Sequence, residues 1–265
     1  MTDGLVGVIG GSGLYELLTD AAPLTVQTPY GAHSDGLTTG VFAGRKVAFI
    51  PRHGLGHALP PHLVNYRANL WALSSLEVTQ IMAPCAAGSL RPELEPGTFV
   101  IPDQLVDRTR GRATTFVERG TVHVGFAEPY CPTVRSVLVD ASRGSGSQVF
   151  DAGTMVVIDG PRFSTRAESQ WYQQQGWHLV NMTGHPEAVL ARELALCYAP
   201  LAVVTDMDAG VAGHAAVTQF DALATFARSL ERLQQVLDKA VRGLPEHRSC
   251  NCAHALDGMA ADYLP

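Results

Sequence analysis

The stretch LVGVIGGSG, from Leu5 to Gly13, decides the fold. A short apolar run that ends in glycines is typical of a buried strand followed by a tight loop. Apolar runs recur at 46–51, 78–84, 99–102, 154–158 and 201–205. Because they are apolar throughout rather than alternating, they predict strands of a mostly parallel sheet that is covered on both faces.

Helix signals separate these strands. Spacing and start or stop residues predict helices at 65–76, 133–142, 165–175, 186–197 and 218–241. The last is amphipathic, with one apolar face made by Leu223, Phe226, Leu230, Leu233 and Leu237. Alternating strands and helices predict an α/β fold, in which ligands bind beyond the carboxyl ends of the strands. We expect one domain over 1–245 and a tail over 246–265.

Composition excludes several functional classes. The chain has 265 residues, 46% of them hydrophobic and 17% charged, with a net charge of −6 and no basic run. A partner nucleic acid or an anionic membrane surface is therefore not expected. We see neither a signal peptide nor an apolar run that could span a bilayer. Five cysteines, an odd number, fit reduced thiols and a cytoplasmic protein.

Two strand ends carry groups suited to an anion. Glycines 10, 11 and 13 would let backbone N–H groups approach a phosphate, and Ser12 adds a hydroxyl, although a plain tight turn explains the same residues. After the strand 46–51, Arg52 offers a cationic fork and His53 a further donor. A metal site made by His53 with His57 and His62 is the weaker alternative, because glycines and prolines prevent one helix from aligning them.

Two later strand ends add further candidates. Thr183 lies at the start of a predicted helix, where a hydroxyl and free N–H groups favour an anion, or simply cap the helix, and Met182 beside it could pack on a sugar. Asp206 and Asp208 follow the strand 201–205, and alternate residues of an extended chain share one face. A close carboxylate pair raises the pKa of one member, but it also fits a divalent metal or a solvated turn.

The tail holds a compact group, with Cys250 and Cys252 between His247 and His254. Such residues can bind zinc or form a redox pair. Cys-x-Cys is tighter than the usual spacing of zinc ligands, so an exposed, reducible tail is the default interpretation.

Together these motifs resemble the trimeric purine nucleoside phosphorylase family, and within it the methylthioadenosine phosphorylase branch. The resemblance runs from about Val6 to the long C-terminal helix and is carried, in the family's order, by the stretches 7–14, 51–54, 64–73, 160–164, 181–183 and 205–208. It implies a single domain with a twisted mixed β-sheet flanked by helices, a homotrimer, and no metal or organic cofactor. Inorganic phosphate is then a co-substrate, and the reaction belongs to purine salvage.

The resemblance also implies roles for individual residues. The residues expected to bind phosphate are Ser12, Arg52, His53, Cys85, Ala86 and Thr183. Those expected to contact the nucleoside are Phe163, Met182, Asp206, Asp208 and, across a subunit interface, His123. Ser164 and Gln219 are expected to tune which base is accepted. Arg52, His53 and the two aspartates are the expected catalytic residues. Asp206 would act as an acid toward the purine N7, and Asp208 would accept a hydrogen bond at the 6-position. This pair favours adenine, whereas the branch that takes 6-oxopurines has Asn at the position of Asp206.

Two departures from the family pattern affect the substrate. Cys85 stands where the family has a hydroxyl residue, and a thiol is a weak donor. The stretch 209–213, which would shape the pocket for the 5′ substituent, is small and flexible. Methylthioadenosine is therefore the expected substrate, a 6-oxopurine nucleoside is the alternative, and hydrolysis or a zinc-dependent scaffold without catalysis are the competing classes.

Overall fold

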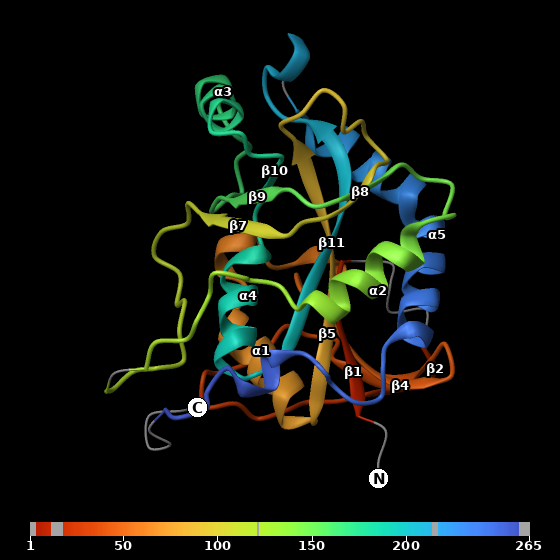
Figure 1. Cartoon of the computed structure of the whole chain (residues 1–265), viewed down its shortest axis with the longest axis vertical. Helices are drawn as coiled ribbons and strands as arrows, with labels where there is room; N and C mark the ends of the chain where they lie inside the picture. The colour runs from red at the N-terminus through yellow and green to blue at the C-terminus, as the bar shows by residue number, and fades with distance from the viewer. Residues whose placement is uncertain (1–3, 12–17, 121, 214–216, 260–265) are drawn as a thin grey trace.

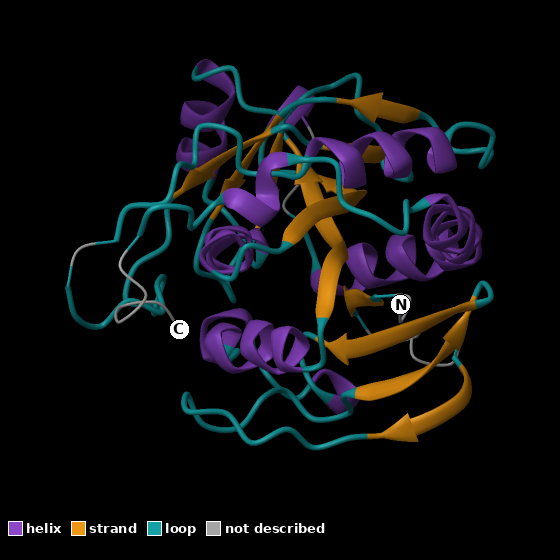
Figure 2. Cartoon of the chain, turned by 60° about the horizontal axis from the view of Figure 1, so that its bottom comes forward, coloured by secondary structure: helices purple, strands orange, loops and turns teal. Residues whose placement is uncertain are grey.

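The computed structural model describes residues 4–11, 18–120, 122–213 and 217–259. In this part of the chain a single 11-stranded sheet is flanked by five α-helices (Figures 1 and 2). The strands are β1 (Leu5–Gly10), β2 (Thr19–Pro23), β3 (Thr38–Phe42), β4 (Arg45–Pro51), β5 (Val78–Ser89), β6 (Phe99–Ile101), β7 (Gln104–Asp107), β8 (Val149–Asp151), β9 (Thr154–Val157), β10 (Leu179–Asn181) and β11 (Cys197–Met207). The helices are α1 (Tyr66–Ser75), α2 (Pro132–Ser142), α3 (Arg166–Gln174), α4 (Gly184–Glu193) and α5 (Gln219–Gly243).

The sheet is mixed. Its main path runs β2-β3-β4-β1-β5-β10-β9-β7, and β11 pairs with β5 on one side and β6 on the other. The central strands β4, β1, β5 and β11 are parallel to one another, whereas β3 is antiparallel to β4, β10 to β5, and β6 to β11. The α/β fold with a mixed sheet flanked by helices is thus confirmed.

Helices cover the long central strands on two sides. α1 and α4 pack on each other on one side, and α2 and α5 on the other, with α2, α4 and α5 all touching β11 (Figure 1). The buried side chains between these layers form one large cluster, to which β1, β5 and β11 contribute most of their apolar residues. This explains why those strands are apolar throughout: both of their faces lie in the core.

Three helices begin where the sequence places a cap. The side chains of Asn65, Thr165 and Thr218 accept hydrogen bonds from backbone N–H groups in the first turns of α1, α3 and α5. At α3 the carboxylate of Glu168 also accepts a hydrogen bond from the Thr165 N–H, which completes a capping box. These caps satisfy N–H groups that have no partner inside the helix.

The structure corrects several sequence predictions. Five strands, β2, β3, β7, β8 and β10, were not predicted, because they are short and either exposed or flanked by irregular chain. The helix predicted to continue to Cys197 ends at Glu193, and Cys197 instead begins β11. On α5, Leu223 is 53% exposed, and the buried face lies further along the helix, around Leu233 and Leu237.

No helix in the described ranges is long and apolar enough to cross a membrane.

Unequal strand lengths open a notch in the sheet. β1 ends at Gly10 and β4 at Pro51, but their neighbour β5 continues to Ser89 and β11 to Met207. In Figure 1 the arrowheads of β5 and β11 accordingly reach past the end of β1. The notch is where most of the predicted site residues lie.

Candidate active site

The wall of the notch is one edge of β5. β1 pairs with β5 as far as Met82, and β10 pairs with it at Gly88 and Ser89. Between these two stretches no described strand pairs with that edge. Ala86 lies here and is exposed, although the strand around it is buried. The backbone of β5 is therefore accessible at the middle of the sheet.

Arg52 closes one end of this edge. Its guanidinium donates to the carbonyls of Ile9 and Pro84, each at 3.1 Å, and so bridges the end of β1 to β5. It also forms two bonds with the Glu187 carboxylate, at 2.5 and 3.1 Å, which raise the pKa of the guanidinium. Arg52 is buried, and these four bonds leave one of its five N–H groups for a ligand.

Asn181 binds to the other end of the unpaired edge of β5. Its Nδ2 donates to the Ala86 carbonyl at 2.8 Å, and its Oδ1 accepts from the N–H groups of Thr183 and Gly184, each at 2.7 Å. Thr183 is the N-cap of α4, so this one amide fixes the helix start against β5. In an extended strand the N–H and C=O of a residue point to the same side, so the Ala86 N–H also faces the notch.

His53 is neutral at pH 7. Burial, together with the charges of Arg52 and His57, lowers its pKa to about 4. Its Nδ1 lies 2.8 Å from the Leu59 carbonyl, which can only accept, so the proton is on Nδ1. Nε2 of the neutral ring is then an acceptor, not the donor that the sequence analysis expected. His57, with its ring centre 4.2 Å away, stacks on His53 rather than joining it around a metal.

Cys85 precedes Ala86 within β5 and is buried beside Arg52. Burial raises the pKa of its thiol to about 12, so it stays protonated. It can offer only the weak S–H donor in place of a hydroxyl.

The two aspartates lie together over Gly88, at the far end of β5. A Cβ on Gly88 would lie 2.9 Å from Asp206 Oδ1 and 3.5 Å from Asp208 Cβ, so both side chains share this face of the sheet, as their spacing predicts. Burial, and to a lesser extent the charge of Asp208, raises the pKa of Asp206 to about 6, against the effect of a 2.7 Å bond from the Thr205 hydroxyl. Asp206 is the more open of the pair, and Asp208 is buried.

Helix α3 holds Asp208. Ser169 on α3 donates its hydroxyl to Asp208 Oδ2 at 2.5 Å. Burial raises the pKa of Asp208, and the hydroxyls of Ser169 and Ser164 partly offset this. Phe163, half-buried, stands just before the capping box of α3. The predicted base-contacting residues therefore gather around one helix start and one strand end.

Met182 packs against Gly160. It is half-buried and lies so close to Gly160 that a Cβ there would be 2.5 Å from its sulfur. Pro61 touches the same glycine position from the other side. Met182 follows Asn181 and precedes Thr183, so it lies at the start of α4.

Of the three remaining predicted site residues, two are exposed and one is not described. Ser12 lies outside the described residues. His123 is exposed in the irregular segment 108–128, which Figure 1 shows leaving the body of the molecule on the side away from α5. Gln219 is exposed at the start of α5.

Three positioning residues were missed by sequence reasoning: Glu187, Asn181 and Ser169. Asn181 and Glu187 lie close to Thr183 in the sequence. Their partners, Ala86 and Arg52, lie 95 and 135 residues away, so nothing local indicated their roles. Ser169 had no signal at all beyond its place on a predicted helix.

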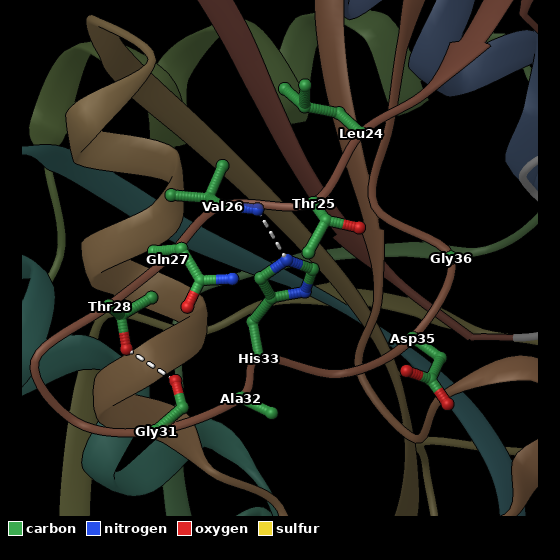
Figure 3. A pocket seen from close by; sticks show the side chains of 10 residues that line it. All are labelled: Leu24, Thr25, Val26, Gln27, Thr28, Gly31, Ala32, His33, Asp35 and Gly36. Atoms are coloured by element: carbon green, nitrogen blue, oxygen red, sulfur yellow. Dashed lines mark hydrogen bonds between the residues drawn. The ribbon is translucent and has the colours of Figure 1, made fainter.

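A hollow of about 250 Å³ lies elsewhere, in the loop between β2 and β3 (Figure 3). None of the predicted site residues lines it, and His33 across its middle is held by hydrogen bonds to Val26 and Ser34. The loop supports the site indirectly, since the Ser34 hydroxyl donates to the Arg52 carbonyl at 2.8 Å and receives a bond from Asn69.

Comparison with known proteins agrees with this geometry. The chain is 54% identical to a purine nucleoside phosphorylase of Streptomyces coelicolor, over 96% of this chain and 95% of the relative. It is 53% identical to an S-methyl-5′-thioadenosine phosphorylase of Mycolicibacterium smegmatis, over 93% of both chains. A crystal structure of methylthioadenosine phosphorylase from an antarctic soil metagenomic library superposes with a TM-score of 0.92 at 39% identity, covering 100% of this chain and 96% of the other. A family model described as the phosphorylase superfamily matches residues 5–242, and the chain belongs to that superfamily.

Proposed function

We propose that this chain is a pentosyltransferase that cleaves 5′-methylthioadenosine with inorganic phosphate, giving adenine and 5-methylthioribose 1-phosphate. The relatives named above support the reaction class and the nucleoside. The observation that carries the proposal is Asp206, a carboxyl group with a pKa of about 6 at the end of a notch whose other end holds a buried arginine. An acid for the leaving base and a cationic site for phosphate thus lie toward opposite ends of the unpaired edge of β5.

Phosphate binds at the exposed edge of β5. We assign its binding to the remaining N–H of Arg52, which follows β4, to the N–H of Ala86 on β5, and to the hydroxyl of Thr183, the N-cap of α4. The two strong bonds to Glu187 offset most of the Arg52 charge, so we assign orientation of the phosphate to backbone and hydroxyl donors as much as to net charge. Ser12, from the loop after β1, is proposed to complete the site.

His53 selects the protonation state of phosphate. Its Nε2 accepts a hydrogen bond when the ring is neutral, so the neutral ring pairs with a P–OH group of the monoanion. A dianion would instead require His53 to take up a proton, against a pKa of about 4 in the free enzyme. Cys85 contributes only a weak donor.

Asp206 assists departure of the base. As the bond to the sugar breaks, electron density accumulates on the purine, and a protonated carboxyl can donate to N7. With a pKa of about 6, roughly a tenth of Asp206 is protonated at pH 7 in the free enzyme, and a bound purine that excludes water would increase that fraction. The sugar then carries positive charge, which the phosphate on its opposite face stabilises.

Asp208 determines which purine base the site accepts. Ser169 donates a hydrogen bond to its carboxylate, and an ionised carboxylate only accepts hydrogen bonds. It therefore suits the 6-amino group of adenine and opposes a 6-oxo group. Phe163 beside it packs on the base, and Met182 packs on the ribose.

Three further features belong to the proposal. The enzyme is a homotrimer in which His123 of one subunit reaches the 5′ pocket of the next, which fits a residue that stands exposed and away from its own site. The reaction needs no metal or organic cofactor. The enzyme acts in the cytoplasm, where free thiols like its five cysteines persist.

The test is purine release from 5′-methylthioadenosine, adenosine and 5′-methylthioinosine, each with and without phosphate. We expect phosphate-dependent adenine release, fastest from 5′-methylthioadenosine. Asp206→Asn should lower it, and Asp140→Asn, at an exposed position on α2, should not. Faster cleavage of 5′-methylthioinosine would contradict the role of Asp208, and release without phosphate would contradict phosphorolysis.

A further inference from the structure

Four of the five cysteines meet at one point, remote from the aspartate pair. The Sγ atoms of Cys131, Cys197, Cys250 and Cys252 all lie within 4.8 Å of one another. The separations include 3.3 Å between Cys197 and Cys250 and 3.6 Å between Cys131 and Cys250. All four are free thiols, well outside the S–S bond length of about 2.0 Å.

We propose that these four cysteines form a structural Zn²⁺ site that fastens the C-terminal tail to the core. Zinc bound by four thiolates has Zn–S distances of about 2.3 Å, which places the sulfurs of a tetrahedron about 3.8 Å apart. In the cluster the sulfurs of Cys197 and Cys250 are 3.3 Å apart and those of Cys131 and Cys250 are 3.6 Å apart. No two of the four sulfurs are more than 4.8 Å apart. Closure around an ion therefore requires only small shifts of the sulfurs.

The ligands come from three separate parts of the chain. Cys131 is the N-cap of α2, Cys197 is the first residue of β11, and the other two belong to the tail after α5. Figure 1 shows that tail crossing the end of the sheet at which β11 begins. One ion would thus join α2, β11 and the tail.

The surroundings suit a metal thiolate. Three of the four cysteines are buried and Cys250 is partly exposed, so the sulfurs are shielded while an ion can still enter. Binding of the ion would release the four thiol protons and leave a net charge of −2.

A cation lies close enough to balance that charge. Arg248 stands two residues before Cys250 and donates to the Ala195 carbonyl at 2.7 Å, two residues before Cys197. The histidines beside the Cys-x-Cys pair do not take part: His254 is exposed and bonds to Asp257, and His247 is exposed. The donor set is therefore four sulfurs, which favours zinc or iron over harder metals.

The site is structural rather than catalytic. Cys197 and Asp206 occupy opposite ends of β11, nine residues and therefore on the order of 30 Å apart along an extended strand. All four protein ligands are sulfurs and no coordination position is left for substrate. The proposal stands whether or not the proposed function is correct.

The first measurement is metal content of the full-length protein, purified with a phosphine reductant and dialysed against metal-free buffer. We expect about one zinc per chain by elemental mass spectrometry. Cys250→Ser and Cys252→Ser should each retain at least tenfold less zinc after the same dialysis. Cys85→Ser, which changes the one cysteine outside the cluster, should retain all of it. Cys131 and Cys197 lie in the core, so their replacement is avoided because it can prevent folding.

Two further readouts test the geometry and the role. Metal-free protein titrated with Co²⁺ should develop the visible absorption bands of tetrahedral thiolate coordination, and Cys250→Ser should not. Removing zinc with a chelator should lower the Tm of the wild-type protein by on the order of 5 °C and leave that of Cys250→Ser unchanged.

Three results would overturn the proposal. One is protein that binds neither zinc nor cobalt while all four thiols react freely with an alkylating agent. Another is mass-spectrometric detection of disulfides among the four cysteines in protein prepared without reductant and alkylated before unfolding. Iron in place of zinc in the purified protein would overturn the assignment of the ion.

Discussion

At the scale of single residues, burial gives this site its chemistry. Asp206 and Asp208 have the same side chain and lie over the same glycine, but they differ in their partners. Asp208 accepts a hydrogen bond from Ser169 on α3, whereas Asp206 accepts one from the hydroxyl of its neighbour Thr205. The more open carboxyl is thus free to meet a ligand, and its pKa of about 6 permits it to carry a proton there.

Asp206 should therefore govern the pH dependence of the reaction. We expect kcat/KM to fall as pH rises above about 6, because the acid form of the free enzyme is lost. Asp206→Asn should lower kcat by about 10²-fold or more with a smaller change in KM, and should flatten that profile. A kcat/KM that rises through the same pH range would contradict the role of a protonated Asp206.

The same pKa affects stability. The folded value of about 6 exceeds the unfolded value of about 3.9, so folding favours the protonated form. Its contribution is fully present below pH 4 and is lost as pH rises through about 6. Thermal unfolding of wild-type and Asp206→Asn proteins should show the wild type losing stability relative to the variant across this range.

The buried charge of Arg52 is balanced by its ion pair with Glu187. Both side chains are buried, and Glu187 also accepts a 2.8 Å bond from the Tyr198 hydroxyl. Glu187→Gln should lower the free energy of unfolding by about 3–5 kcal/mol, because it leaves the Arg52 charge buried without its partner. Tyr198→Phe, which removes one hydrogen bond, should cost only about 1 kcal/mol. Equal losses in urea unfolding would argue against a charge-based role for Glu187.

At the scale of elements, the site exists because strands of unequal length lie side by side. β5 extends beyond the end of β1, and the antiparallel strand β10 reaches it only at Gly88 and Ser89. The gap exposes the backbone around Ala86, and α4 begins beside it. Asn181, at the end of β10, holds the two together with both ends of its amide.

Asn181→Ala should separate these elements. We expect the KM for phosphate to rise at least tenfold, with a smaller change in the KM for the nucleoside. Asn181→Asp is the matched variant, because it keeps the acceptor for the Thr183 and Gly184 N–H groups and loses only the donor to Ala86. If Asn181→Asp resembles the wild type, the bond to β5 is dispensable, and the start of α4 alone positions the phosphate.

At the scale of the whole molecule, two predicted site residues are exposed to solvent in the single chain. His123 and Gln219 are both exposed, while the residues they should serve lie in the notch. A second copy of the chain supplies His123 in the proposed trimer.

Subunit mixing tests this arrangement. Asp206→Asn chains lack the acid, and His123→Ala chains lack the residue passed to a neighbour. If the proposal is correct, each variant alone should be weakly active, and co-expression should restore activity at sites that combine Asp206 of one chain with His123 of the other. The mass in solution should be about three times the 28.3 kDa chain. A monomer, or mixed assemblies without restored activity, would contradict the shared site.

By itself the sequence determined the α/β class, the central strands and the start of most helices, because these depend on hydrophobic runs and capping residues that are neighbours in the chain. It also placed Asp206 and Asp208 on one face, since strand alternation is local. The long-range pairs are different. Arg52 meets Glu187 across 135 residues, and Cys131 meets Cys250 across 119. Only the closed sheet brings such groups together, and the pKa of Asp206, the tautomer of His53 and the four-sulfur cluster all follow from that closure, because burial and neighbouring charge are properties of the packed structure.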